Sequence, residues 1–185
     1  MRNNWLLLGV IHIQTLFFMT IYIKRFASAL LCFFFMLSAV AQNSMPASSP
    51  TPALNKQIVA FVDKHMGKKI GRGECWDLAK YSLNEAGAKW DKAFKYGKPI
   101  DPKKDEVFPG DFIQFENVKV QFEKDGGIHT ETMTQHTAVV YKVNAPGVYV
   151  IAHQNNAFSG RKMGTSELDL ATVKRGKLKF YRPTN

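Results

Sequence analysis

The sequence predicts an α+β domain in which N-terminal helices pack on an antiparallel β-sheet. Apolar residues recur at helical spacing over residues 54–66 and 74–86. From residue 111 onward the chain instead contains β-rich runs separated by Gly, Pro and Asn. Because the helices come first and the strands follow without helices between them, we expect neighbouring strands to pair antiparallel.

The two predicted helices are separated by a glycine-containing segment. The first, residues 54–66, has one apolar stripe made of Leu54, Ile58, Phe61, Val62 and Met66. The second, residues 74–86, follows a Gly-Arg-Gly turn, and Gly87 is placed to cap its C-terminus. Residues 88–108 are polar, basic and contain proline, which predicts a long loop.

Four β-rich runs follow the loop, at residues 111–122, 136–143, 147–153 and 177–183. The segment between the first two runs is rich in turn residues, and we expect it to be a loop that carries His129. This arrangement predicts that His136 opens one strand and that His153 closes the next.

Residues 1–41 have the features of a secretory signal peptide. Basic residues and no acidic ones precede an apolar run, which ends in the A-x-A site Ala39-Val40-Ala41. Met19 is an alternative start. The apolar run is shorter than the ~20 residues of a membrane span. We therefore expect cleavage before Gln42, no stable membrane insertion afterwards, and a secreted or periplasmic protein.

Residues 42–53 are rich in Pro and Ser, which predicts a flexible linker. Residues 54–185 then remain as one domain, long enough to bury a core without disulfides. The whole chain carries 25 basic and 15 acidic residues. The basic residues are scattered, as on a solvated surface, although attraction to a polyanion is the alternative. No nucleic-acid motif is present, so no nucleic-acid partner is expected, and no oligomeric state is predicted.

Cys75 stands at the start of the second predicted helix, and the other cysteine, Cys32, lies in the predicted signal peptide. The free N–H groups and positive partial charge of a helix N-terminus lower a thiol pKa, which makes Cys75 a candidate nucleophile. The alternative is a small buried hydrophobic residue. An exported thiol without a partner is open to oxidation, and its presence favours a functional role.

His136 is the candidate base for this thiol, and a third polar group would orient its ring. Side chains alternate along a strand, so a turn with an even number of residues places His136 on the same face as His153 and Asn155. We predict that His153 orients the base, with Asn155 as the second choice. Gln154 is expected to face away and to tolerate substitution.

The order of four segments resembles a known family. A helix-start cysteine is followed by FPGDFIQF (108–115), HTAVVYKV (136–143) and VIAHQN (150–155), as in the papain-like fold of CHAP and NlpC-type cell-wall amidases. GECWDLA (73–79) and LKFYRP (178–183) are similar to the cysteine-proteinase-fold domain of some fungal actin-patch proteins.

The resemblance implies a papain-like domain over residues 54–185 that uses no cofactor. Cys75 would be the nucleophile and His136 the base, while His153 and Asn155 match the third position. The implied function is a secreted thiol hydrolase that cleaves an amide bond, with peptidoglycan or another peptide-containing polyanion as substrate.

Two other functions stay open. Glu74 stands directly before Cys75, where its carboxylate would raise the thiol pKa and could not donate to an oxyanion. The fungal relatives also make a non-catalytic binding module credible. A zinc site formed by Cys75, His136 and His153 ranks last, because no C-x-x-C or H-E-x-x-H spacing supports it.

Overall fold

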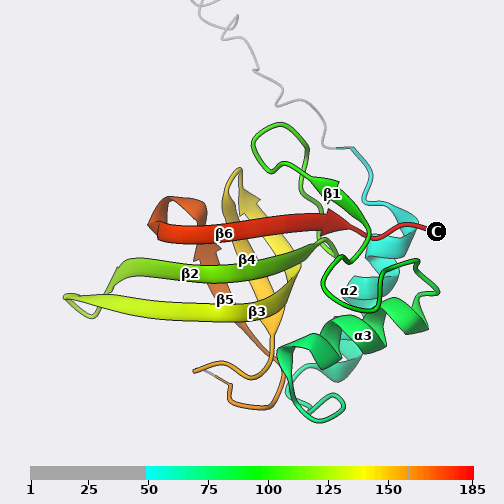
Figure 1. The fold of residues 1–185 in the computed structure, drawn as a ribbon, viewed down its shortest axis with the longest axis horizontal. Helices are drawn as coiled ribbons and strands as arrows, with labels where there is room; N and C mark the ends of the chain where they lie inside the picture. Colours follow the sequence, from blue (N-terminus) through cyan, green and yellow to red (C-terminus); the bar gives the residue numbers. More distant parts are fainter. Residues whose placement is uncertain (1–48, 158) are drawn as a thin grey trace, which may run out of the picture. The chain divides into compact units, whose positions relative to one another are not determined.

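Two helices and a six-stranded antiparallel sheet make up the part of the chain that the computed structural model describes, residues 49–157 and 159–185 (Figure 1). The predicted signal peptide and most of the predicted linker lie outside these residues. None of the helices in these residues combines the length and the hydropathy that a membrane span requires.

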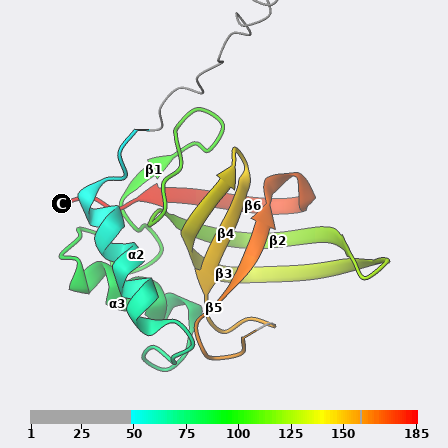
Figure 2. The ribbon, with the colours of Figure 1, turned by 180° about the vertical axis from the view of Figure 1, so that it is seen from behind.

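The helices follow the prediction closely. Helix α2 spans Ala53–His65 and helix α3 spans Cys75–Glu85. Beyond α3, Gly87 has a φ of 67°, a left-handed conformation that glycine adopts without strain. The two helices lie side by side at one end of the sheet, and the hairpin of β2 and β3 extends from the other end (Figures 1 and 2).

The strands have the order β1-β6-β2-β3-β4-β5, and every neighbouring pair is antiparallel, which confirms the predicted sheet type. Their bounds are β1 Lys98–Ile100, β2 Phe112–Lys124, β3 Gly127–Ala145, β4 Val148–His153, β5 Gly164–Asp169 and β6 Val173–Arg182, with the 3₁₀ helix η1 at Leu170–Thr172. Strand β1 lies inside the segment predicted to be a loop.

The prediction was wrong about the start of β3. This strand begins at Gly127, so His136 lies within it, and His129 belongs to a strand and stacks on Phe122 with ring centroids 5.7 Å apart. Strand β5 was not predicted at all. Both segments are mostly polar, and they become strands because they pair with β2 and β4, which supply their backbone partners.

The sheet separates two hydrophobic clusters. Phe112, Val139 and Ala152 face the helices, while Ile113, Ala138 and Ile151 face the opposite side. We call these the helix face and the open face. Among the described residues the open face holds no α-helix, and only the 3₁₀ helix η1 packs there, through Leu170. The pairing of Phe112 with Val139 and of Val139 with Ala152 shows that these three residues share a face. Their sequence neighbours lie on the other face, as the alternation along a strand requires.

In the β3–β4 hairpin, His136 and His153 lie on the same face, as predicted, but the pairing of the two strands is less regular than expected. Ala145 pairs with Val148 across a two-residue turn, and two register shifts then separate this pair from the pair Val140–Ile151. Each single-residue shift exchanges the faces that the residues of one strand share with those of the other. Two shifts therefore restore the original arrangement. His136 and His153 consequently share the open face.

Candidate active site

The start of α3 is held in place by local hydrogen bonds. The carboxylate of Asp77 accepts from the backbone N–H groups of Arg72 at 2.8 Å and Glu74 at 3.2 Å. Glu74 is the N-cap residue, and Cys75 is therefore the first residue of the helix, as the sequence predicts. This short loop determines where the thiol sits.

Gln154 ties the same loop to the end of β4. Its side chain is fully buried, and it accepts from Ile70 N–H at 3.1 Å. It also donates to the carbonyl oxygens of Ile70 at 3.0 Å and Glu74 at 2.7 Å. Gln154 does face away from His136. Removing its amide would leave these buried backbone groups unpaired, so the contacts lead us to expect a cost of substitution that the sequence did not predict.

Asn155 lies with Glu74 instead of with the ring of His136. Its side-chain amide donates to the Glu74 carboxylate at 2.7 Å, and its backbone has a φ of 58°. Arg161 pairs with the same carboxylate at 3.0 Å. Asn155 was the second choice for the residue that orients His136, but in the described part of the chain it makes no hydrogen bond to that ring. The left-handed turn directs its side-chain amide toward the start of α3 instead.

The histidines form a hydrogen-bonded pair on the open face. Nε2 of His136 and Nδ1 of His153 are 2.9 Å apart, and Nε2 of His153 lies 3.0 Å from the hydroxyl oxygen of Ser166. His136 is 5% exposed and His153 4% exposed. Ser166 is the residue that sequence reasoning missed. Its strand, β5, was not predicted, so no signal placed it near the pair.

Burial controls the charge of this pair. Desolvation lowers the pKa of His136 to about 4, and desolvation together with the neighbouring His136 lowers the pKa of His153 to about 3. Both rings are consequently neutral near pH 7. A neutral imidazole has one N–H and one lone pair, which is the form that a general base requires.

Two proton arrangements satisfy both hydrogen bonds. In one, His136 Nε2–H donates to His153 and His153 Nε2–H donates to Ser166, which leaves the lone pair on His136 Nδ1 free. In the other, Ser166 donates to His153 and His153 donates to His136, so the proton lies on His136 Nδ1. The chain of His136, His153 and Ser166 can therefore present Nδ1 as an acceptor or as a donor.

The thiol environment differs from the prediction. Burial raises the pKa of Cys75, and the charge of Glu74 raises it further, while the backbone amides of Thr137, Trp76 and Cys75 lower it in part. The predicted depression of this pKa is thus wrong, because desolvation outweighs the helix N-terminus. Within residues 49–157 and 159–185, Cys75 has no hydrogen bond to His136, but its thiol faces the backbone of Thr137, the residue after that histidine.

A neutral polar cluster fixes Thr137 on the helix face. The hydroxyl group of Tyr96 lies 2.9 Å from the amide oxygen of Gln114 and 2.8 Å from the hydroxyl of Thr137, which donates to the same amide oxygen at 2.8 Å. All three residues are buried. Their mutual bonds hold the strand segment against which the thiol lies.

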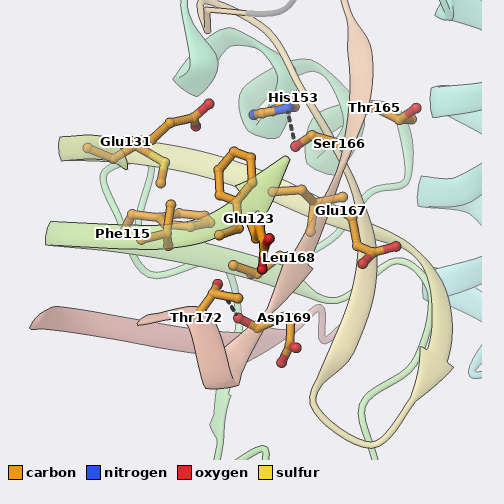
Figure 3. Close-up of a pocket in the computed structure, with 14 residues that line it drawn as sticks. Phe115, Glu123, Glu131, His153, Thr165, Ser166, Glu167, Leu168, Asp169 and Thr172 are labelled. Atoms are coloured by element: carbon orange, nitrogen blue, oxygen red, sulfur yellow. Dashed lines mark hydrogen bonds between the residues drawn. The ribbon is translucent and has the colours of Figure 1, made fainter. Parts of the chain in front are cut away.

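Two adjoining cavities open at the histidine pair. A groove of about 590 Å³ is lined by residues 130–136 of β3 together with His153 and residues 155–157. A pocket of about 410 Å³ lies farther along the open face, with His153 and Ser166 at one end (Figure 3). Glu131, Met133 and His153 line both, so the pair borders one extended depression.

The zinc alternative finds no support in this geometry. Among the described residues, no group of three or more His, Cys, Asp or Glu side chains is placed to hold a metal ion. Both ring nitrogens of His153 are already hydrogen-bonded, one to His136 and the other to Ser166.

The chain is similar to a known family and to a curated protein. Residues 51–185 match the family described as "AIM3/BBC1 Cysteine proteinase-fold domain". A curated relative, "Altered inheritance of mitochondria protein 3" of Debaryomyces hansenii, is 28% identical over 144 residues, which cover 68% of this chain and 15% of the relative. The chain thus corresponds to a small part of that relative's length.

Two solved structures are also similar. "The crystal structure of Ly7917" shares 15% identity and a TM-score of 0.43, covering 69% of this chain and 62% of that one. "The crystal structure of Ly7917 with the hydrolyzing product of MDP" shares 14% identity and a TM-score of 0.46, covering 70% and 62%.

Proposed function

The chain belongs to the AIM3/BBC1 cysteine-proteinase-fold family, and from that premise we propose that it is a thiol hydrolase that cleaves an amide bond. Cys75 is the nucleophile, His136 the base and His153 the residue that orients the base. The observation that carries the proposal is the 2.9 Å bond between the two buried imidazoles, next to the strand segment that the thiol faces.

The reaction starts from neutral partners. The Cys75 S–H proton passes to Nδ1 of His136 as the sulfur attacks the substrate carbonyl carbon, and the backbone N–H of Cys75 faces the oxyanion. The proton then passes from His136 to the leaving amine, which breaks the C–N bond and leaves a thioester. A water molecule then gives a proton to His136 and attacks the thioester. His136 returns that proton to the departing sulfur, which releases the carboxylic acid and the free thiol.

The raised pKa of Cys75 is compatible with this order of events. A thiol that is protonated at rest must lose its proton during attack, so the enzyme needs a base instead of a preformed ion pair. Catalytic hydrogen bonds are often long without substrate and shorten in the reactive complex. The absence of a Cys75–His136 bond in the described residues therefore leaves the roles of both side chains intact.

We also propose export and a peptide substrate of the cell wall. The support is the A-x-A site that ends at Ala41 and the excess of basic residues, which favours a polyanionic matrix. N-terminal sequencing of the exported protein is expected to begin at Gln42. A mature protein that retains residues 26–41 would contradict cleavage and make the protein membrane-tethered.

The direct test is incubation of the full chain with purified peptidoglycan and with a mixture of synthetic peptides, followed by mass spectrometry of the released fragments. Cleavage is expected with the wild type and with Cys32→Ser, and not with Cys75→Ala. Iodoacetamide should inactivate the protein and a chelator should not. Fragments released equally by Cys75→Ala would overturn the proposal.

A non-catalytic binding module is the second candidate. It is favoured by the raised pKa of Cys75, the carboxylate of Glu74 beside it, and the missing bond to His136 among the described residues. This candidate predicts retention of the wild type on a peptide or peptidoglycan column, equal retention of Cys75→Ala, and no released fragments.

A further inference from the structure

The pocket on the open face combines an apolar floor with acidic groups. Its volume is about 410 Å³, within the range of small-ligand sites. The apolar lining residues come from four strands and are Phe115, Val120, Phe122, Met133, Ile151 and Leu168. Figure 3 shows two of these residues, Phe115 of β2 and Leu168 of β5.

The charged residues of the pocket are all acidic. Glu123, Glu131, Glu167 and Asp169 line it, and no Lys or Arg does. These are four of the 15 acidic residues in a chain with 25 basic ones, so the charged lining of the pocket is acidic although the chain as a whole is basic.

The carboxylate of Asp169 caps η1 by accepting from the Ala171 N–H at 2.8 Å. In the part of the chain that the structure describes, Glu123, Glu131 and Glu167 form no ion pair with Lys or Arg. Glu131 pairs with Val120 across β2 and β3 and therefore shares its face, toward the apolar floor. Partial burial raises the pKa of this carboxyl, and the neighbouring His129 lowers it in part. A bound cation would offset the remaining desolvation.

We propose that this pocket binds an ammonium group carried on an apolar stem, as in a lysine-like side chain. The methylene stem would lie on Val120, Met133 and Leu168, and the ammonium group would lie near Glu131 at the rim. A bare metal ion would not use the apolar floor, and an anion or an uncharged apolar group would leave the carboxylates desolvated without a partner.

The position of the pocket links it to the histidine pair. His153 and Ser166 line one end of it, and Glu131, Met133 and His153 also line the groove that contains His136. A peptide in the groove can therefore place a side chain in the pocket. The assignment of the pocket as a substrate subsite rests on the proposed function, whereas its preference for a cation does not.

The test measures binding without catalysis. The full chain carrying Cys75→Ala is labelled with ¹³C at the methionine methyl groups and titrated with Nα-acetyl-lysine amide or Nα-acetyl-norleucine amide, which has the same stem without the ammonium group. The Met133 methyl signal, assigned with Met133→Leu, should shift with the lysine compound, and Met66 and Met163 should not. The norleucine compound should bind about fivefold more weakly or worse, as expected for one lost charge pair.

Matched variants separate the carboxylate from general charge. Glu131→Gln should weaken binding of the lysine compound by about threefold to tenfold, with Glu123→Gln as a second variant at the rim. Glu85→Gln, on α3 and outside both cavities, should leave it unchanged. Equal or tighter binding of the norleucine compound, or no Met133 shift, would overturn the proposal.

The two proposals fail separately. A Met133 shift without peptide cleavage by the wild type would remove the hydrolase and leave the cation pocket. Cleavage that does not distinguish lysine from norleucine in the substrate, together with an unmoved Met133 signal, would leave the hydrolase and remove the pocket.

Discussion

His153 and Gln154 are neighbours in the chain and serve opposite faces of the sheet. Gln154 is fully buried and bonds only to backbone groups of the loop before α3. His153 is nearly as buried, at 4% exposed, but it bonds to His136 and Ser166 and lines both cavities. The comparison teaches that equal burial does not mean an equal role.

The two faces of the sheet differ in the same way as these two residues. On the helix face the buried polar groups of Tyr96, Gln114 and Thr137 satisfy one another and carry no charge near neutral pH. On the open face the buried groups are titratable and adjoin solvent-accessible cavities. We interpret the helix face as the support that positions the start of α3, and the open face as the side where ligands bind.

The largest expected effect that tests the contrast between His153 and Gln154 is a loss of activity on substitution of His153. His153→Ala should lower kcat by about 10²–10⁴-fold with little change in KM, because His136 would lose the partner that orients its ring. Steady-state kinetics on a cleaved peptide would measure this. His65→Ala, on α2 and outside the groove, is the matched control. Equal kcat for the two variants would assign His153 to packing alone.

The second effect is a pH dependence of stability. The pKa values of His136 and His153, about 4 and about 3, lie below the ordinary value of 6.5. On acidification below pH 6.5 the unfolded chain takes up protons that the folded chain does not, so stability falls. The loss is about 1.4 kcal/mol per pH unit for each histidine, down to the folded pKa.

Urea unfolding between pH 7.5 and 4.5 would measure this dependence, with the wild type losing stability steadily over the acidic part of the range. The double variant His136→Gln/His153→Gln should show a shallower slope, because its unfolded state gains two fewer protons. Identical slopes would mean that the pair is charged in the folded protein.

The third effect tests the support role of Gln154. Gln154→Ala should lower the free energy of unfolding by about 3 kcal/mol, because the buried backbone groups of Ile70 and Glu74 lose their partners. Gln57→Ala, an exposed change of the same type on α2, should change it by less than about 0.5 kcal/mol. Chemical denaturation of both variants measures the difference, and similar values would contradict the support role.

The smallest effect concerns the thiol between the two faces. In a Cys32→Ser background, the alkylation rate of Cys75 should reach its midpoint at higher pH than that of an unstructured cysteine peptide, because burial raises the thiol pKa. Glu74→Gln should move this midpoint to lower pH by removing a nearby negative charge, and Glu85→Gln should not. A midpoint below that of the peptide would restore the thiolate expected from the helix start alone.

The sequence predicted those elements whose signals are local. Both helices were placed within one or two residues, because apolar periodicity and flanking glycines belong to contiguous residues. The hairpin of β3 and β4 and the shared face of His136 and His153 were also predicted, from strand alternation. That success depended on two register shifts that cancel, which no sequence pattern indicated.

The rest depended on contacts between distant residues. The first part of β3 and all of β5 are mostly polar, and each places only one apolar residue, Met133 or Leu168, against the open-face cluster. Their sequences therefore lack the repeated apolar alternation that marks a half-buried strand. Ser166 and the acidic pocket were missed for that reason. Asn155 was misplaced because its left-handed backbone follows from the turn after β4.

The sequence by itself determined the α+β class, the helix-start cysteine and the two histidines on one face, because periodicity and alternation are properties of neighbouring residues. Only the tertiary structure decided how buried each group is. Burial set the direction of the pKa shifts of Cys75, His136 and His153. Desolvation depends on every element packed around a side chain, and for Cys75 it outweighed the helix N-terminus that the local sequence made visible.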